Sequence, residues 1–214
     1  MSGADGGAWT GPDEPPRREG HAGARPAGPP GRPSAPLAVV LAGGRSRRMG
    51  APKATVALGG RPLLAWPLTA AAEAGLEAVV VAKPGSALPE LDVPVWAEPE
   101  RPSHPLTGIV AALERAAPRA IVALACDMPF VPPDLIARLA GLDAVAAAPP
   151  GEAFPARYAP AALPALRAAL AREAPLRAAL AELGPAEIAA ANPDRALLGV
   201  NDPAALARAE RLLR

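Results

Sequence analysis

The chain has 214 residues, of which half are hydrophobic but only 3% aromatic, and its formal net charge is +1. This length allows one sizeable domain with or without a tail, and the low aromatic content predicts a core of Leu, Val and Ala. Because acidic and basic residues are spread along the chain, we expect neither a nucleic-acid footprint nor a membrane-binding basic patch.

The remaining composition favours a soluble cytoplasmic protein. The single cysteine, Cys126, rules out an internal disulfide framework and is typical of a reducing compartment. No apolar run approaches the roughly 20 residues that a membrane helix needs. Arg17 and Arg18 are not followed by an apolar segment, so we expect no secretory signal.

The first 36 residues contain eight glycines and eight prolines, interleaved with Ala, Arg and Glu. A segment of this composition buries too little apolar surface to offset the entropy lost on ordering. We therefore expect a disordered tail over residues 1–36 and a folded domain over residues 37–214. A dispensable tail is favoured over an interaction segment.

From residue 37 onwards the pattern alternates between strands and helices. We expect strands over 36–42, 78–82, 93–98 and 120–127, and helices over 61–75 and 106–117. Pro67 is expected to kink or divide the first of these helices. The rest of the chain predicts a helix from Pro132 and Pro133, strands over 144–149 and 153–158, two Ala/Leu helices, weak strands over 186–191 and 196–200, and a last helix from Pro203.

Strands separated by helices predict an α/β fold of the Rossmann-like type, with a mostly parallel sheet and helices on both faces. Residues 153–158 follow the preceding strand so closely that we expect one antiparallel member. Sheets of this kind bind ligands beyond the carboxyl ends of their strands. Two segments that contain candidate functional residues follow such strand ends: residues 43–53 and residues 126–127.

The segment LAGGRSRRMGAPKA (41–54) combines bare backbone with positive charge. Gly43 and Gly44 let the backbone approach a ligand closely, and successive N–H groups in such a turn form an anion site. Lys53 stands out because the chain has only two lysines among 22 basic residues. The alternative is a basic surface loop with turn glycines, since neither common nucleotide fingerprint is present.

This segment resembles the signature of the nucleotidyltransferase family, which reads roughly Leu-Ala-Gly-Gly-x-Ser-x-Arg-Met-Gly-x-Asp-Lys. Within that family the resemblance is to the molybdenum cofactor guanylyltransferases. Four further segments resemble family motifs in the expected order: HPLTGIVAAL (104–113), CDMPFVPPDL (126–135), FPARYAPAALPAL (154–166) and VNDPAALARAE (200–210). The resemblance implies Mg²⁺-dependent transfer of GMP from GTP to molybdopterin with release of pyrophosphate. It implies no nucleic-acid or membrane partner, and allows transient contact with molybdoenzymes or cofactor-synthesis proteins.

The same resemblance implies roles for individual residues. The nucleotide would be held by Leu41, Ala42, Gly43 and Gly44, and its phosphates would meet Arg48 and Lys53. Glu98 is a further nucleotide contact, or else a solvated carboxylate at a strand end. Asn201 would contact the molybdopterin side.

Asp127 is the candidate metal ligand and, with Arg48 and Lys53, a candidate catalytic residue. It follows eight largely apolar residues, where an unpaired carboxylate is costly to bury. At a strand end it can instead hold Mg²⁺ together with triphosphate oxygens, which is its role in the resembling family. The alternative is a turn or helix-capping Asp. We expect Cys126 to be a small buried residue and His104 to lie in a loop, and no Cys/His spacing indicates zinc.

Several residues depart from the guanylyltransferase pattern. Pro52 stands where an Asp usually precedes the signature lysine, which is closer to the sister cytidylyltransferases, and His104 replaces a Gly. Lys83 and Pro84 lie near a position that often holds Asn, and only the second asparagine of the closing motif, Asn201, is kept. Three hypotheses therefore stay open: guanylyl transfer to molybdopterin, nucleotidyl transfer from CTP or to another small phosphorylated acceptor, and a nucleotide-binding adaptor without catalysis.

Overall fold

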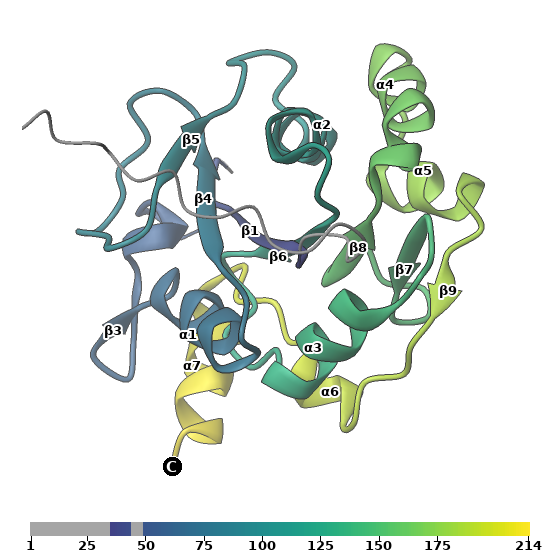
Figure 1. The fold of residues 1–214 in the computed structure, drawn as a ribbon. Helices are drawn as coiled ribbons and strands as arrows, with labels where there is room; N and C mark the ends of the chain where they lie inside the picture. The colour runs from purple at the N-terminus through teal and green to yellow at the C-terminus, as the bar shows by residue number, and fades with distance from the viewer. Residues whose placement is uncertain (1–34, 44–48) are drawn as a thin grey trace, which may run out of the picture. The chain divides into compact units, whose positions relative to one another are not determined.

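The computed structural model describes residues 35–43 and 49–214, and a seven-stranded sheet runs through it (Figure 1). The strand order is β5-β4-β1-β6-β8-β7-β9. In chain order these strands are β1 (Leu37–Leu41), β4 (Ala78–Ala82), β5 (Val95–Ala97), β6 (Ile121–Ala125), β7 (Ala146–Ala148), β8 (Ala156–Tyr158) and β9 (Ala186–Glu187). Strand β8 pairs antiparallel with both β6 and β7, and the other neighbouring pairs are parallel. The predicted mostly parallel sheet with one antiparallel member is confirmed.

Helices cover both faces of this sheet, as predicted (Figure 1). One face carries α2 (Pro105–Ala116), α4 (Leu163–Ala171) and α5 (Leu176–Glu182), and the other carries α1 (Ala65–Glu73) and α3 (Pro133–Gly141). The side chains of β1 alternate between the two layers, with Leu37 and Val39 in the first core and Ala38 and Val40 in the second. This alternation is the two-residue period of a strand buried on both faces.

The carboxyl ends of four strands are held at one edge of the sheet by backbone bonds that continue past the strands. The N–H of Ala42 donates to the carbonyl of Val81 at 2.8 Å, and that of Cys126 donates to Leu41 at 3.2 Å. The N–H of Glu98 donates to the carbonyl of Ala82 at 3.0 Å. The residues that follow β1, β4, β5 and β6 therefore come together, as parallel pairing requires.

A third apolar cluster attaches the last part of the chain beside this edge. It packs the hairpin of β2 (Ala57–Leu58) and β3 (Arg61–Pro62) against α7 (Pro203–Leu212), and its buried members include Leu58, Leu63 and Ala209. Asp202 caps α7, because its carboxylate accepts from the N–H of Ala205 at 2.8 Å. The remaining short elements are η1 (Lys53–Thr55), η2 (Pro160–Ala162) and α6 (Pro193–Ala196).

Two local predictions are wrong. Helix α1 is neither kinked nor divided by Pro67, because it begins at Ala65 and so places Pro67 in its first turn. A proline there removes no intrahelical hydrogen bond. Residues 196–200 do not form the predicted weak strand; α6 ends at Ala196 and an irregular segment follows it. The predicted tail over residues 1–36 lies outside the described residues, except for Ala35 and Pro36.

None of the helices in the described part of the chain is both long and apolar enough to span a bilayer.

Candidate functional site

Two adjoining hollows open at the carboxyl edge of the sheet. The larger has a volume of about 1400 Å³ and the smaller about 810 Å³. Five residues line both: Gly43, Lys53, Lys83, Ser103 and His104. The larger hollow continues between residues 84–87 and 100–102. The smaller hollow continues past Asp127 to Asn201 and Phe154. Residues from several distant segments thus meet at the junction of the two hollows.

Lys53, Asp127 and Asn201 form the polar centre of this junction. The Nζ atom of Lys53 donates to Oδ2 of Asp127 at 2.6 Å and to Oδ1 of Asn201 at 2.5 Å. The side chains of Lys53 and Asp127 are 19% and 16% exposed, so water screens their attraction less than it screens a surface ion pair. Sequence reasoning predicted all three residues, and the structure brings them into direct contact.

Local backbone features place these three residues. Lys53 begins η1, where the N–H of Thr55 donates to the carbonyl of Pro52 at 3.0 Å. Asp127 is the second residue after β6, and its carbonyl accepts from the N–H of Val200 at 2.8 Å. That bond holds Val200, the residue before Asn201, against Asp127. Helix α3 has Pro132 as its N-cap, so Asp127 does not cap this helix, but it does lie in the turn after β6, as the turn alternative expected.

The junction offers oxygen ligands to a hard cation. Oδ2 of Asp127 and Oδ1 of Asn201 converge on a single point, which is occupied by the ammonium group of Lys53. In this structure the ammonium group is the cation that the carboxylate and the amide oxygen hold. Oxygen donors of this kind, completed by phosphate oxygens and water, are those that Mg²⁺ prefers. In residues 35–43 and 49–214, no three His, Cys, Asp or Glu side chains gather as a metal cluster.

Glu98 lies against Gly43 and is buried, with 7% of its side chain exposed. The alternative of a solvated strand-end carboxylate is therefore wrong. Burial raises the pKa of the Glu98 carboxyl, and the neighbouring charge of Lys83 acts in the opposite direction. The Oε1 atom is so close to Gly43 that a Cβ at that position would lie 2.1 Å from it. A side chain at position 43 would therefore force the Glu98 carboxylate to move.

His104 occupies the loop expected for it and also caps α2. The Nδ1 atom of its ring accepts from the backbone N–H of Leu106 at 3.2 Å, and the backbone N–H of His104 donates to the carbonyl of Pro102 at 3.0 Å. Because Nδ1 is the acceptor, the proton of the neutral ring is on Nε2. The sequence predicted the loop position of His104 but not its capping role, for which Pro105, a common first helical residue, was the available signal.

Cys126 is buried beside Asp127, as predicted for a small apolar residue. Desolvation raises the pKa of its thiol to about 12, and the charge of Asp127 acts in the same direction. Thiol nucleophiles act as thiolates, so this cysteine is not placed for nucleophilic catalysis.

The predicted nucleotide residues lie where the hollows begin. Ala42 lines the larger hollow, Leu41 lines the smaller one, and Gly43 lines both. Gly44 and Arg48 lie outside the described residues, so their predicted roles stay predictions. Lys83 is the residue whose importance sequence reasoning missed, since only its departure from the usual Asn pattern had been noted.

Comparison with known proteins identifies the family. A sequence model described as "MobA-like NTP transferase domain" matches residues 38–188, well over half of the chain. The chain belongs to this family. The match begins in β1 and extends to Ile188, just after β9, so it includes the glycine loop, Glu98 and Asp127 but not Asn201.

Curated relatives of this MobA-like chain are named molybdenum cofactor guanylyltransferase. The one from Cereibacter sphaeroides is 40% identical over 188 residues, which cover 82% of this chain and 96% of the relative. The one from Rhodobacter capsulatus is 43% identical over 110 residues, covering 48% of this chain and only 56% of the relative.

Solved structures share the MobA-like fold. Molybdopterin-guanine dinucleotide biosynthesis protein A from Archaeoglobus fulgidus has a TM-score of 0.67 at 24% identity, covering 83% of this chain and 98% of that one. The 2-C-methyl-D-erythritol 4-phosphate cytidylyltransferase from Thermus thermophilus has a TM-score of 0.63 at 24% identity, covering 83% and 98%. At this identity the two structures support the fold alone, which is the predicted nucleotidyltransferase type.

Proposed function

We propose that this protein is a Mg²⁺-dependent guanylyltransferase that transfers GMP from GTP to molybdopterin and releases pyrophosphate. The observation that carries the proposal is the convergence of Lys53, Asp127 and Asn201 at the junction of two hollows. The identity of the substrates is inferred from the names of relatives that align over most of the chain. A reaction between two phosphate-bearing molecules needs two adjoining spaces that meet at a charged centre, and this site has both.

The larger hollow suits the nucleotide. Gly43 and Lys53 line its inner end, where backbone N–H groups and a positive charge favour phosphates. Residues 84–87 and 100–102 line its outer part, which leaves room for the ribose and base. The smaller hollow suits the acceptor, because Met128, Phe154 and Leu197 give it apolar walls around the polar junction.

In the proposed reaction, an oxygen of the acceptor phosphate attacks the α-phosphorus of GTP. A new phosphorus–oxygen bond forms, and the bond between the α-phosphorus and the bridging oxygen of the β-phosphate breaks, so pyrophosphate leaves with the electron pair. No side-chain nucleophile is required. Catalysis can rest on alignment of the two phosphates and on neutralisation of their charge by Lys53 and, by resemblance, Arg48.

Asp127, assisted by Asn201, would hold the magnesium ion. When bound there, the ion supplies positive charge that draws phosphate oxygens together and makes the α-phosphorus more electrophilic. We also propose that the protein acts in the cytoplasm, where its one thiol stays reduced and its small-molecule substrates are present.

The test measures thermal stabilisation by GTP, CTP, ATP and UTP, each with and without Mg²⁺, for the wild-type protein and for Asp127→Ala. A nucleotide at about 100 times its Kd should stabilise the protein by about 2.7 kcal/mol. We expect a Mg²⁺-dependent shift with GTP that Asp127→Ala weakens. Pyrophosphate release from GTP in the presence of molybdopterin then tests the transfer itself.

The alternatives give different results in the same experiment. A preference for CTP would assign the protein to cytidylyl transfer, which the Pro52 departure and the shared cytidylyltransferase fold allow. If a nucleotide binds but no pyrophosphate is released in the presence of any phosphorylated acceptor, the protein is an adaptor. Absence of any nucleotide shift would contradict the proposal.

A further inference from the structure

Lys83 and Glu98 form an ion pair that sequence patterns did not predict. Lys83 follows β4 and Glu98 follows β5, two neighbouring parallel strands. The Nζ atom of Lys83 lies 3.5 Å from Oε1 of Glu98, and the two side chains are only 15% and 7% exposed. The same Nζ donates to the carbonyls of Pro99 and Glu100, both at 2.9 Å. One ammonium group therefore binds three consecutive residues of the segment that follows β5.

The carboxylate of this pair is wedged between two glycines from other elements. A Cβ at Gly43, which follows β1, would lie 2.1 Å from Oε1, and a Cβ at Gly108 in α2 would lie 2.5 Å from Oε2. Glu98 is thus the point where the ends of β1, β4 and β5 meet α2. A carboxylate this enclosed is costly to keep ionised unless an opposite charge compensates it.

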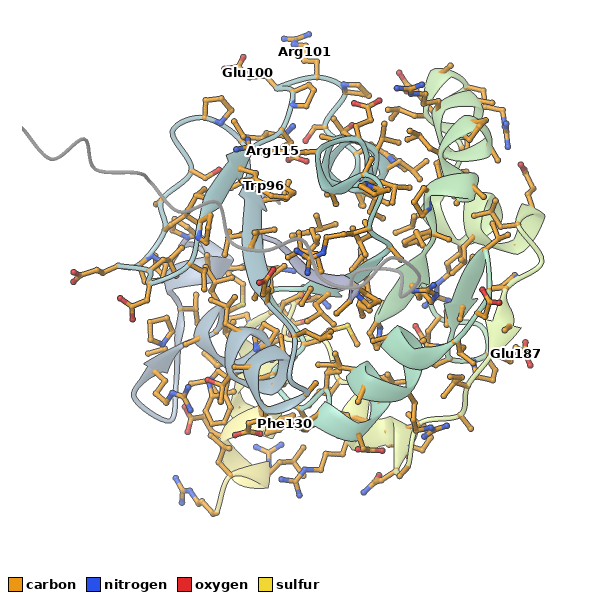
Figure 2. All side chains as sticks on the ribbon, viewed as in Figure 1. Trp96, Glu100, Arg101, Arg115, Phe130 and Glu187 are labelled. Carbon is orange, nitrogen blue, oxygen red and sulfur yellow. The ribbon has the colours of Figure 1, made fainter. Side chains whose placement is uncertain are left out.

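The pair stands at one end of a wall of the larger hollow. Residues 100–104 line that hollow, and Lys83 holds the start of this segment through the Glu100 carbonyl. The hydroxyl of Thr107 holds its other end by donating to the carbonyl of Pro102 at 2.9 Å. Between these two anchors, the side chains of Glu100 and Arg101 project outward from the loop (Figure 2).

We propose that Lys83 is a positioning residue for nucleotide binding, which acts by pairing with Glu98 and so fixing residues 99–103 as one wall of the larger hollow. The part concerning the nucleotide rests on the function proposed above. The pair itself does not, because its effect on the stability of the protein can be measured without a nucleotide. Lys83 acts through Glu98 and the loop carbonyls, and not through contact with the phosphates.

The pH dependence of stability follows from the charges that face Glu98. Within the described residues, β4 brings Lys83 against this carboxylate, whereas β1 and α2 bring the uncharged Gly43 and Gly108. Lys53, Asp127, His104, Glu152 and Arg177 line the same smaller hollow. Because burial raises the pKa of Glu98 in the folded state, its contribution to stability is greatest in acid and is lost as the pH rises through that pKa. Removing Lys83 raises that pKa further, so the loss extends to higher pH.

The experiment is a double-mutant cycle with Lys83→Met, Glu98→Gln and both together, and Lys83→Arg as the conservative variant. Thermal stability is measured from pH 5 to pH 8.5 without nucleotide. We expect the Tm of Lys83→Met to fall further below that of the wild type as the pH rises. Glu98→Gln should remove this pH dependence whether residue 83 is Lys or Met. The Kd for GTP with Mg²⁺ is measured at pH 7.5. Lys83→Met should weaken binding on the order of tenfold in the wild-type background and much less in the Glu98→Gln background, since coupled residues are not additive.

Three results would overturn the inference. One is a GTP affinity that Lys83→Met leaves unchanged; another is an equal loss in both backgrounds, which would mean that Lys83 does not act through its pairing with Glu98. The third is a pH dependence that Lys83→Met does not alter. If Lys83→Met does not fold, Lys83→Arg and Glu98→Gln still test the pair, since the guanidinium should keep the wild-type pH dependence and the amide should abolish it. Failure of the wild-type protein to bind any nucleotide would refute the proposed function, while the pH cycle would still decide whether the pair exists.

Discussion

The Nζ atom of Lys53 lies 2.6 Å from Oδ2 of Asp127, although 74 positions separate the two residues in the chain. Asn201, a further 74 positions along, accepts a hydrogen bond from the same nitrogen. Three segments that are independent in sequence therefore meet around one positive charge. On the proposed function this arrangement would hold a cation and phosphate oxygens together, because its charges are already in place before a ligand arrives.

Asp127→Asn should remove most of the Mg²⁺-dependent activity while the fold is kept. The amide has nearly the same shape, so packing is preserved, but it lacks the charge that binds the ion. We expect kcat to fall on the order of 100-fold or more, as when a group that stabilises transition-state charge is lost. Steady-state pyrophosphate release measures this effect, with circular dichroism as the control for folding. Turnover close to that of the wild type would contradict the assignment of Asp127.

Lys53→Met should weaken the interaction with the phosphates and leave the apolar stem of the side chain in place. We expect kcat/KM for GTP to fall on the order of tenfold or more, which is the effect of losing one charged hydrogen bond. Lys53→Arg keeps the charge, but its planar fork does not match the single point at which Asp127 and Asn201 converge. It should therefore recover only part of the activity. Complete recovery by arginine would show that charge alone matters.

The sequence predicted Lys53 and Asp127 because each belongs to a local pattern that ends a strand or follows a glycine turn. It also predicted the sheet and its faces, because apolar runs and helical spacing are local properties. It did not predict that Asn201 would bind Lys53, since the approach depends on a backbone bond between Val200 and Asp127. The Lys83–Glu98 pair was missed for a similar reason: its geometry depends on Gly108 in a helix that follows both residues.

The thiol of Cys126 should be unreactive in the folded protein. Burial raises its pKa from the ordinary 9.0 to about 12, so almost no thiolate is present at pH 8. Labelling with a chromogenic disulfide at pH 8 should be negligible in buffer and reach one group per chain in denaturant, since the chain has one cysteine. The unfolded thiol loses its proton at lower pH than the folded one, so stability should also fall as the pH rises from about 9 towards 12. Rapid stoichiometric labelling of the folded protein would show that Cys126 is accessible.

Gly108→Ala should destabilise the protein, although the same change in a helix interior normally stabilises by about 0.5–1 kcal/mol. The new Cβ would lie 2.5 Å from Oε2 of Glu98 and 3.0 Å from Cδ2 of Leu41. The carboxylate cannot retreat easily, because Lys83 and Gly43 confine it on other sides. Overpacking of this kind costs about 1–3 kcal/mol, and each kcal/mol lowers Tm by about 2–4 °C in a domain of this size.

Gly141→Ala is the matched control for this substitution. Gly141 is the last residue of α3, and a Cβ built there meets nothing within 4 Å. The Tm of the Gly141→Ala variant should stay at the wild-type value or rise slightly. The sharper comparison is Gly108→Ala in a Glu98→Ala background, where the obstructing carboxylate is gone. There the substitution should become neutral or stabilising, because only the helix preference of alanine remains. An equal loss of Tm in both backgrounds would mean that Leu41, and not Glu98, limits the space beside α2.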